Sequence, residues 1–406
     1  MASIEPSLSA TMPDAGAFAV PAGWRFTALL IFTQLPGVIA YTIPLPLLAG
    51  LAGELAHDAT SAWLAKMVLG ILGPSMAVGA LGGGWLADKA DRRWLIIGMG
   101  AIYLLASVAP AFLDSLVVIV LARFVTGMMS GALAAVGMTM VGDYLPENKR
   151  AGTIGMLSAL NMIASLVTLP MGGFVGDFGW RHAFLLYLLA LPVVVLASLS
   201  PLPVPPRPPA QRSQTGRAVR WYSGVPLSLF LLSLAVGVIL TVPGIYVSFH
   251  LATIGLGKAS TVSMLMMLNS ALAAVFSSLF GRAWGYSPRA VFVAGFSAMG
   301  VGLMMLAYAT GPASAGAALL LMGIAMGLLA PSVMARVVDM VEEGKRGQVV
   351  GAAQGLMAIA PLIVLSALEP LLPRIGTIGV MAAVGALSLG LFAVFALQRV
   401  KPGDGG

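Results

Sequence analysis

The sequence contains no cysteine, and only three of its 406 residues are histidine. The absence of cysteine excludes disulfide bonds, thiolate metal sites and cysteine nucleophiles. His57, His182 and His250 are far apart along the chain, so we expect no metal centre and no cofactor.

Charged residues are also scarce, at 9% of the chain, whereas 59% of the residues are hydrophobic. A soluble domain has about 25% charged and about 45–50% apolar residues. The composition excludes a disordered chain, a coiled coil and a nucleic-acid-binding protein, in spite of a net charge of +7. We therefore predict an all-α polytopic protein in a lipid bilayer, with the excess of basic residues explained by its topology.

Apolar runs of about 20 residues, the length that crosses a bilayer as a helix, follow one another along most of the chain. Twelve spans are predicted. They fall at 25–52, 60–87, 92–112, 115–144, 150–175 and 181–202, and at 225–254, 260–284, 290–309, 313–338, 346–372 and 376–398.

A segment rich in proline and arginine separates the two sets of six spans. Because proline lacks a backbone donor and stiffens the chain, this segment is predicted to be a linker. The predicted organisation is a cytoplasmic N-terminal tail (1–24), a six-helix bundle (25–202), a cytoplasmic linker (203–224), a second six-helix bundle (225–398) and a cytoplasmic tail (399–406).

The two halves repeat each other at a constant offset of 196 residues. The matching positions are Gly127, Gly131, Asp143, Glu147, Lys149, Arg150 and Gly155 with Gly323, Gly327, Asp339, Glu343, Lys345, Arg346 and Gly351. A parallel duplication of a six-span unit predicts two bundles related by a pseudo-two-fold axis along the membrane normal.

The basic residues are distributed unevenly between the two sides of the predicted membrane. Seventeen of the 22 fall on the side that holds both termini, and three fall on the opposite side. Loops rich in Lys and Arg stay in the cytoplasm. Both termini are therefore predicted to be cytoplasmic, in a multi-pass protein of the cell membrane, specifically a bacterial inner membrane.

The loop between the second and third spans reads Gly84-Trp85-Leu86-Ala87-Asp88-Lys89-Ala90-Asp91-Arg92-Arg93. It resembles the G-x-x-x-D-[R/K]-x-G-[R/K]-[R/K] signature of the major facilitator superfamily, except that Asp91 replaces the internal glycine. The twelve spans, the duplicated halves and the central linker resemble the same family. The resemblance implies the major facilitator fold and a secondary transporter.

The same loop predicts a conformational latch, formed by Gly84, Asp88, Lys89, Arg92, Arg93 and Asp143. Asp88 can face the positive end of another helix, and Arg92 can reach Asp143 at the end of the fourth span. Such a latch would hold the two halves together on the cytoplasmic side. The alternative is a solvated loop that only sets topology. The second half keeps a weaker echo around Gly281 and Arg289.

The fourth span contains Arg123 followed by Gly127 and Gly131, which resembles a motif of proton-coupled family members. Small residues four apart allow close helix packing, and Gly323 and Gly327 are expected to pack in the same way. A guanidinium inside a bilayer is costly unless it meets a partner or a water-filled path. We predict that Arg123 faces the cavity; the alternatives are snorkelling to the interface and bonding to carbonyls of a neighbouring span.

Lys66 is the second cation inside a predicted span, and with Arg123 it would form a positive zone. No carboxylate falls at mid-membrane, which makes cationic drugs unexpected substrates. Asp114, Glu369 and His250 are the candidates for proton exchange at the periphery.

The fifth span ends with Pro170, Gly172 and Gly173, which resemble a degenerate antiporter motif; a kinked, closely packed helix would explain them equally well. The family resemblance makes Gln34, Tyr41 and Tyr246 candidate solute contacts, and Asn269 is added to this pathway. Buried amides can instead form hydrogen bonds between helices.

These features predict proton-linked export of a small organic solute by alternating access. The alternatives are uptake or facilitated transport of a small anionic or zwitterionic metabolite and, more remotely, a polytopic membrane enzyme. No G-x-x-x-x-G-K-[S/T] loop occurs, so ATP is not expected to drive the process. We expect a proton gradient as the driving force and a monomer.

Overall fold

The computed structural model describes residues 24–87, 89–199, 225–341 and 343–397, and the regular elements in these ranges are all helices. The first half contains α1 (Trp24–Thr42), η1 (Leu45–Leu47), α2 (Leu48–Leu55), α3 (Ala59–Gly70), α4 (Leu72–Ala87), α5 (Arg92–Val108), η2 (Ala109–Phe112), α6 (Leu116–Tyr144), α7 (Glu147–Gly176), α8 (Trp180–Phe184), η3 (Leu185–Ala190) and α9 (Leu191–Leu199). The second half contains α10 (Leu227–Thr253), α11 (Ala259–Tyr286), α12 (Pro288–Ala307), α13 (Pro312–Met340), α14 (Glu343–Leu368), η4 (Glu369–Leu371) and α15 (Leu372–Leu397).

Within the described residues, ten helical stretches are long and apolar enough to cross a membrane, or eleven if the bent pair α3 and α4 is one span. One stretch, Val349–Leu397, has 49 residues, which is about 74 Å of helix and enough for two crossings. It divides at η4 and again at Gly376, whose φ of 65° favours glycine. With the bent pair counted as one span and the stretch Val349–Leu397 counted as two, the described helices match the twelve predicted spans.

The bend of 43° between α3 and α4 has a local cause. Pro74 cannot donate a hydrogen bond to the Gly70 carbonyl and its ring clashes with it, so the helix breaks at Ile71. At the other end of α3, Asp58 is the N-cap and accepts hydrogen bonds from the Ser61 amide and hydroxyl. These bonds hold the pKa of Asp58 below its usual value. The start of α3 is thus fixed at neutral pH.

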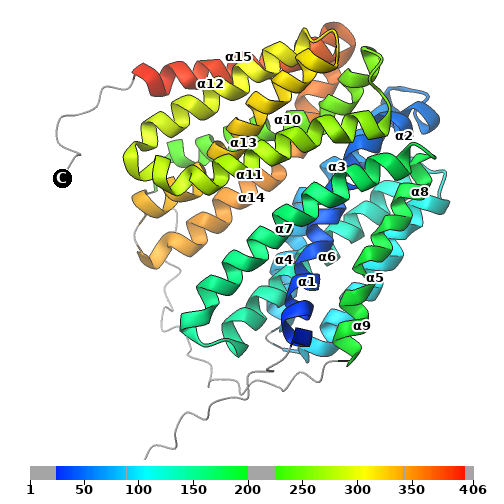
Figure 1. Cartoon of the computed structure of the whole chain (residues 1–406), viewed down its shortest axis with the longest axis vertical. Coiled ribbons are helices and arrows are strands. Elements are labelled where there is room, and N and C mark those ends of the chain that lie inside the picture. The colour runs from blue at the N-terminus through cyan, green and yellow to red at the C-terminus, as the bar shows by residue number, and fades with distance from the viewer. Residues whose placement is uncertain (1–23, 88, 200–224, 342, 398–406) are drawn as a thin grey trace, which may run out of the picture.

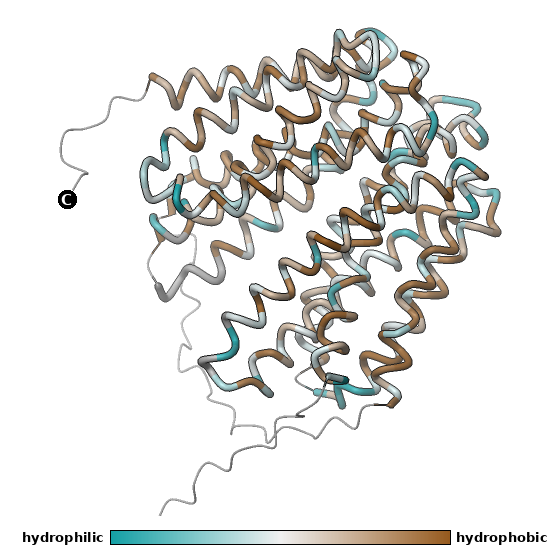
Figure 2. Tube along the Cα trace, in the orientation of Figure 1, coloured by the Kyte–Doolittle hydropathy of each residue, from teal (hydrophilic) through white to brown (hydrophobic). Residues whose placement is uncertain are grey.

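The six spans of each half form a bundle, and the two bundles lie against each other at one end only (Figure 1). In this view they meet at the upper right, near α2 and α8, and spread apart toward the lower left. Figure 2 shows apolar residues along the helices and hydrophilic residues gathered at their ends, as expected for a chain in lipid. We call the end that carries Arg92, Arg93 and Arg289 the basic end, and the other the opposite end.

Glycines bring the second and fourth spans of each half into backbone contact. A Cβ at Gly127 would lie 1.9 Å from the Ser75 hydroxyl of α4, and one at Gly131 would lie 2.0 Å from a carbonyl of the same helix. In the second half, Gly323 and Gly327 of α13 approach α11 with corresponding distances of 2.4 and 2.5 Å to backbone oxygens. Only glycine permits this approach, and the two halves use it in the same way.

A second pair of contacts repeats between the halves. Arg93 at the start of α5 donates to the carbonyls of Ala197 and Ser198 at the end of α9. Its counterpart Arg289 on α12 donates to Phe395 and Ala396 at the end of α15. In each half the third span is therefore tied to the sixth at the basic end, as a duplicated unit requires.

Candidate functional site

The two halves are sealed together at the opposite end by small residues and hydrogen bonds. A Cβ at Gly173 of α7 would lie 2.0 Å from the Ser263 hydroxyl of α11, and one at Gly70 would lie 2.6 Å from Leu365 of α14. The Ser248 hydroxyl donates to the Leu45 carbonyl at 2.6 Å. We call this set of contacts between the halves the seal.

A buried ion pair also crosses the seal. Lys66 of α3 binds Glu369 of η4, and the side chains are only 4% and 13% exposed. Tyr246 of α10 donates from its hydroxyl to the second oxygen of Glu369 at 3.2 Å. The Lys66 ammonium also lies 5.4 Å from the ring centroids of Tyr246 and Phe249. Burial of this cation is offset by one carboxylate and two aromatic faces.

This charge cluster, Lys66, Tyr246, Phe249 and Glu369, brings together three residues that the sequence singled out separately. Lys66 belongs to the first half and the other three to the second, 303 residues away in the case of Glu369. Glu369 therefore neutralises Lys66, and the prediction that Lys66 and Arg123 form a positive zone is wrong for Lys66. Phe249 was missed, because an aromatic residue in an apolar span carries no signal of its own.

The predicted orientation of Arg123 toward the cavity is also wrong. Its side chain is fully buried between helices of the first half. Nε donates to the Val68 carbonyl at 3.2 Å, Nη1 to the Tyr187 hydroxyl at 2.7 Å, and Nη2 to the Ala40 carbonyl.

The position of Pro44 explains why this guanidinium is held there. Pro44 has no amide hydrogen, so the Ala40 carbonyl lacks its helical donor, and Arg123 and Tyr187 supply donors instead. The carbonyl-bonded alternative for Arg123 is the observed arrangement, and Tyr187 is a partner that sequence reasoning missed.

The described residues line two clefts between the halves. One is lined by α7, α11 and α13 and has a volume of about 260 Å³. The other is lined by α4, α10 and α14 and has a volume of about 520 Å³, with almost entirely apolar walls. Both lie on the basic side of the seal, where Leu81 of α4 is 79% exposed.

The uncharged residues predicted for the pathway occupy different environments. Asn269 is 5% exposed and lines the cleft formed by α7, α11 and α13. Gln34 donates to the Ala134 carbonyl at 3.2 Å, which is a hydrogen bond between α1 and α6. The Tyr41 hydroxyl lies beside Gly73 of α4. Of these three, Asn269 is the one that lines this cleft.

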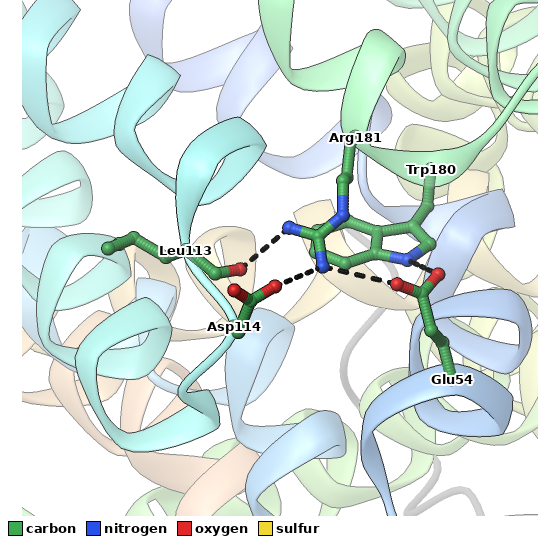
Figure 3. A network of polar contacts seen from close by, with 5 residues as sticks. All are labelled: Glu54, Leu113, Asp114, Trp180 and Arg181. Atoms are coloured by element: carbon green, nitrogen blue, oxygen red, sulfur yellow. Dashed lines mark hydrogen bonds and ion pairs between the residues drawn. The ribbon is translucent and has the colours of Figure 1, made fainter.

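Two of the three candidate proton carriers lie away from the clefts. Asp114 is 87% exposed and pairs with Arg181, which also binds Glu54 and the Leu113 carbonyl; Trp180 binds Glu54 as well (Figure 3). This network joins α2, α8 and the loop before α6 at the surface of the first half, where ion pairs contribute little. His250 is 1% exposed, and neither ring nitrogen makes a well-formed hydrogen bond within the described residues.

One contact of the predicted latch is present in the structure. Arg92 of α5 forms an ion pair with Asp143 of α6, and Lys89 lies 3.7 Å from the ring centroid of Trp85. Asp88 lies outside the described residues. The Arg92–Asp143 pair joins two spans of the same half, so it does not by itself hold the halves together. At the corresponding place in the second half, Trp284 donates to Asp339 at 3.2 Å.

The remaining predicted packing residues lie at the seal or just before the loop between α4 and α5. Gly172 approaches Ile43 at the end of α1, and Gly173 approaches α11. Pro170 lies one turn earlier inside α7. Gly84 has open space where a Cβ would be, so close packing does not explain it.

A sequence profile of the Major Facilitator Superfamily matches residues 30–365, which is most of the chain. The chain belongs to this superfamily. The solved structure of the nucleoside transporter NupG resembles this facilitator with a TM-score of 0.73 at 14% identity, over 93% of this chain and 100% of that one. The likeness confirms the predicted major facilitator fold.

The relatives of this facilitator include proteins with different names. The niacin transporter NiaP of Acinetobacter baylyi is 32% identical over 186 residues, which are 45% of this chain and 39% of that protein. The multidrug resistance protein MdtL of Klebsiella pneumoniae is 24% identical over 400 residues, 93% of this chain and 96% of that protein. The matches to the first relatives span less than two thirds of their length.

Proposed function

We propose that this facilitator exports a small organic solute in exchange for protons, by alternating access. The observation that carries the proposal is the Lys66–Glu369 pair, which closes one end of the interface between the halves while two clefts lie on the other side. Under the orientation predicted from the basic residues, this arrangement corresponds to the inward-open state. No cofactor is required, and one chain contains both halves.

Glu369 can couple closure of the seal to proton release. When the opposite end is open, Glu369 is separated from Lys66 and can take a proton from outside. Closure brings the Lys66 ammonium and the Tyr246 hydroxyl against the carboxylate, so under this proposal the ammonium replaces the proton as the partner of Glu369. The displaced proton then moves toward the clefts.

The return from the inward-open to the outward-open state requires free energy to separate Lys66 from Glu369. In the inward-open state the ion pair resists opening, because separating buried opposite charges is costly. A solute bound between the halves supplies that energy by favouring the outward-open state. Without solute the seal stays closed, which limits proton leak.

Export is favoured over uptake by two features. The fifth span carries the degenerate antiporter motif at Pro170, Gly172 and Gly173, and Gly173 packs against α11 at the seal. A relative that aligns over nearly the whole chain is named a multidrug resistance protein. The alternative is uptake of a small metabolite, which the local identity with a niacin transporter favours.

The test is transport in proteoliposomes with an imposed pH gradient, screened over a panel of metabolites and drugs. We expect a solute whose movement depends on an opposed proton gradient. Glu369→Gln keeps the shape of the side chain but carries no charge, so it should abolish dependence on the gradient while still permitting solute exchange. A gradient dependence that survives in Glu369→Gln would contradict the role of this residue.

A further inference from the structure

The cleft between α7, α11 and α13 is an uncharged surface that offers hydrogen bonds. None of its described lining residues is charged, and Met162, Met326 and several alanines form its apolar wall. Asn269, Ser270 and Ser277 of α11 and Ser165 of α7 provide the polar groups. The two cations of the spans are engaged elsewhere, Lys66 with Glu369 and Arg123 inside the first half.

Asn269 is the unusual member of this lining. Its side chain is almost fully buried, yet within the described residues it makes no hydrogen bond. The amide atoms keep access to the cleft, where water or a bound solute can satisfy them. An amide offers two donors and one acceptor, and this one lines a cleft large enough to hold a ligand.

A backbone carbonyl of the adjacent helix α13 lacks its helical donor beside the same cleft. Pro331 of α13 has no amide hydrogen, so the carbonyl of Gly327 lacks its helical donor. Gly327 and Pro331 both line the cleft. The wall formed by α11 and α13 therefore presents the Asn269 amide and a carbonyl without its helical donor, beside methionine and alanine side chains.

We propose that this cleft binds a small uncharged solute that carries an amide-like donor and acceptor beside an apolar body. An amide-like group offers both a donor and an acceptor to Asn269, and its donor also suits a carbonyl such as that of Gly327, whereas a carboxylate offers only acceptors. An ammonium would find no anion among the lining residues. The volume of about 260 Å³ is below the roughly 300–1,000 Å³ of drug-sized pockets, which favours a small solute. This inference rests on the proposed function as a transporter.

The test measures binding to the purified full-length protein in detergent, without a membrane gradient. The probes are benzamide, benzoate, benzylamine and toluene, which share a ring and differ in charge and in hydrogen-bonding groups. We expect benzamide to bind at least about tenfold more tightly than the other three, as one well-placed hydrogen-bonding group allows. Equal or tighter binding of benzoate, benzylamine or toluene, or no binding of benzamide at millimolar concentration, would overturn the proposal.

Variants of Asn269 locate the site. Asn269→Ala should weaken benzamide binding about tenfold and leave toluene unaffected. Gln354→Ala removes an exposed amide of α14 that does not line this cleft, and it should bind benzamide like the parent. Unchanged benzamide binding in a folded Asn269→Ala protein would also overturn the proposal. Because no proton gradient is used, loss of proton coupling in transport would leave these results intact.

Discussion

Two groups contact the Glu369 carboxylate, Tyr246 from the same half of the molecule and Lys66 from the other half. The pair with Lys66 is predicted to set the population of the closed seal. Glu369→Lys places two cations together and should reduce transport more than tenfold. The double variant Lys66→Glu with Glu369→Lys should recover a large part of the activity, because the attraction is restored in reverse.

Recovery in the double variant should be incomplete for a physical reason. A carboxylate at position 66 would face the electron-rich rings of Tyr246 and Phe249, which favour a cation. The measurement is initial transport rate for the single and double variants, with protein amount and thermal stability as controls. A double variant as inactive as the worse single variant would count against the pair as a gate.

Arg123 is predicted to act on stability. Its three hydrogen bonds, each worth about 0.6–2 kcal/mol in a membrane protein, include one to the carbonyl left free by Pro44. Lysine cannot reproduce the planar fork, so Arg123→Lys should be nearly as damaging as Arg123→Ala. We expect a lower Tm for both and a proportionate loss of transport for anionic and cationic solutes. A stable Arg123→Ala protein with altered charge selectivity would instead restore the role in charge selection.

At the scale of helices, the packing of α4 against α6 depends on glycine. A Cβ at Gly131 would lie 2.0 Å from the Met76 carbonyl, whereas one at Gly142 on the same helix would meet nothing within 4 Å. Gly131→Ala should therefore lower Tm by several degrees and reduce the yield of folded protein, since the helices must separate. Gly142→Ala is the matched control and should leave Tm unchanged. Equal stability of the two variants would contradict the packing argument.

Sequence patterns predicted the helices better than they predicted the site. Twelve spans, the repeat and the Arg92–Asp143 pair follow from hydropathy, spacing and a local motif. The Lys66–Glu369 pair joins residues 303 positions apart, and no local pattern encodes such a contact. The burial of Arg123 depends on a carbonyl that Pro44 leaves free on another helix, and recognising it requires the packing of α1 against α6. The residues that pair with buried charged side chains could therefore not be predicted from the sequence, because these contacts form only when distant helices pack together.

For the whole molecule, the prediction concerns which end is open. Labels at Ser158 of α7 and Ser278 of α11 report on the basic side, and labels at Phe178 and Lys258 report on the opposite end. Because the chain has no cysteine, each pair can be introduced as cysteines on a blank background. In Glu369→Gln we expect the Ser158–Ser278 distance to shorten and the Phe178–Lys258 distance to lengthen, since the seal has lost its ion pair.

The control for these distances is Asp114→Asn. It removes a surface ion pair of the first half that takes no part in the seal, and both distances should match those of the parent. Distance distributions in Glu369→Gln that coincide with the parent would mean that the seal is held by its small-residue contacts alone.

The tight packing of the seal also has an electrical consequence. Glycine and serine contacts leave little room for water there, whereas the clefts on the other side admit it. In a polarised membrane the voltage then falls mainly across the thin sealed layer that contains Lys66 and Glu369. One elementary charge moved across 100 mV exchanges about 2.3 kcal/mol. A proton that passes Glu369 crosses most of that drop within a few ångströms, so the rate of the cycle should follow membrane potential as well as pH.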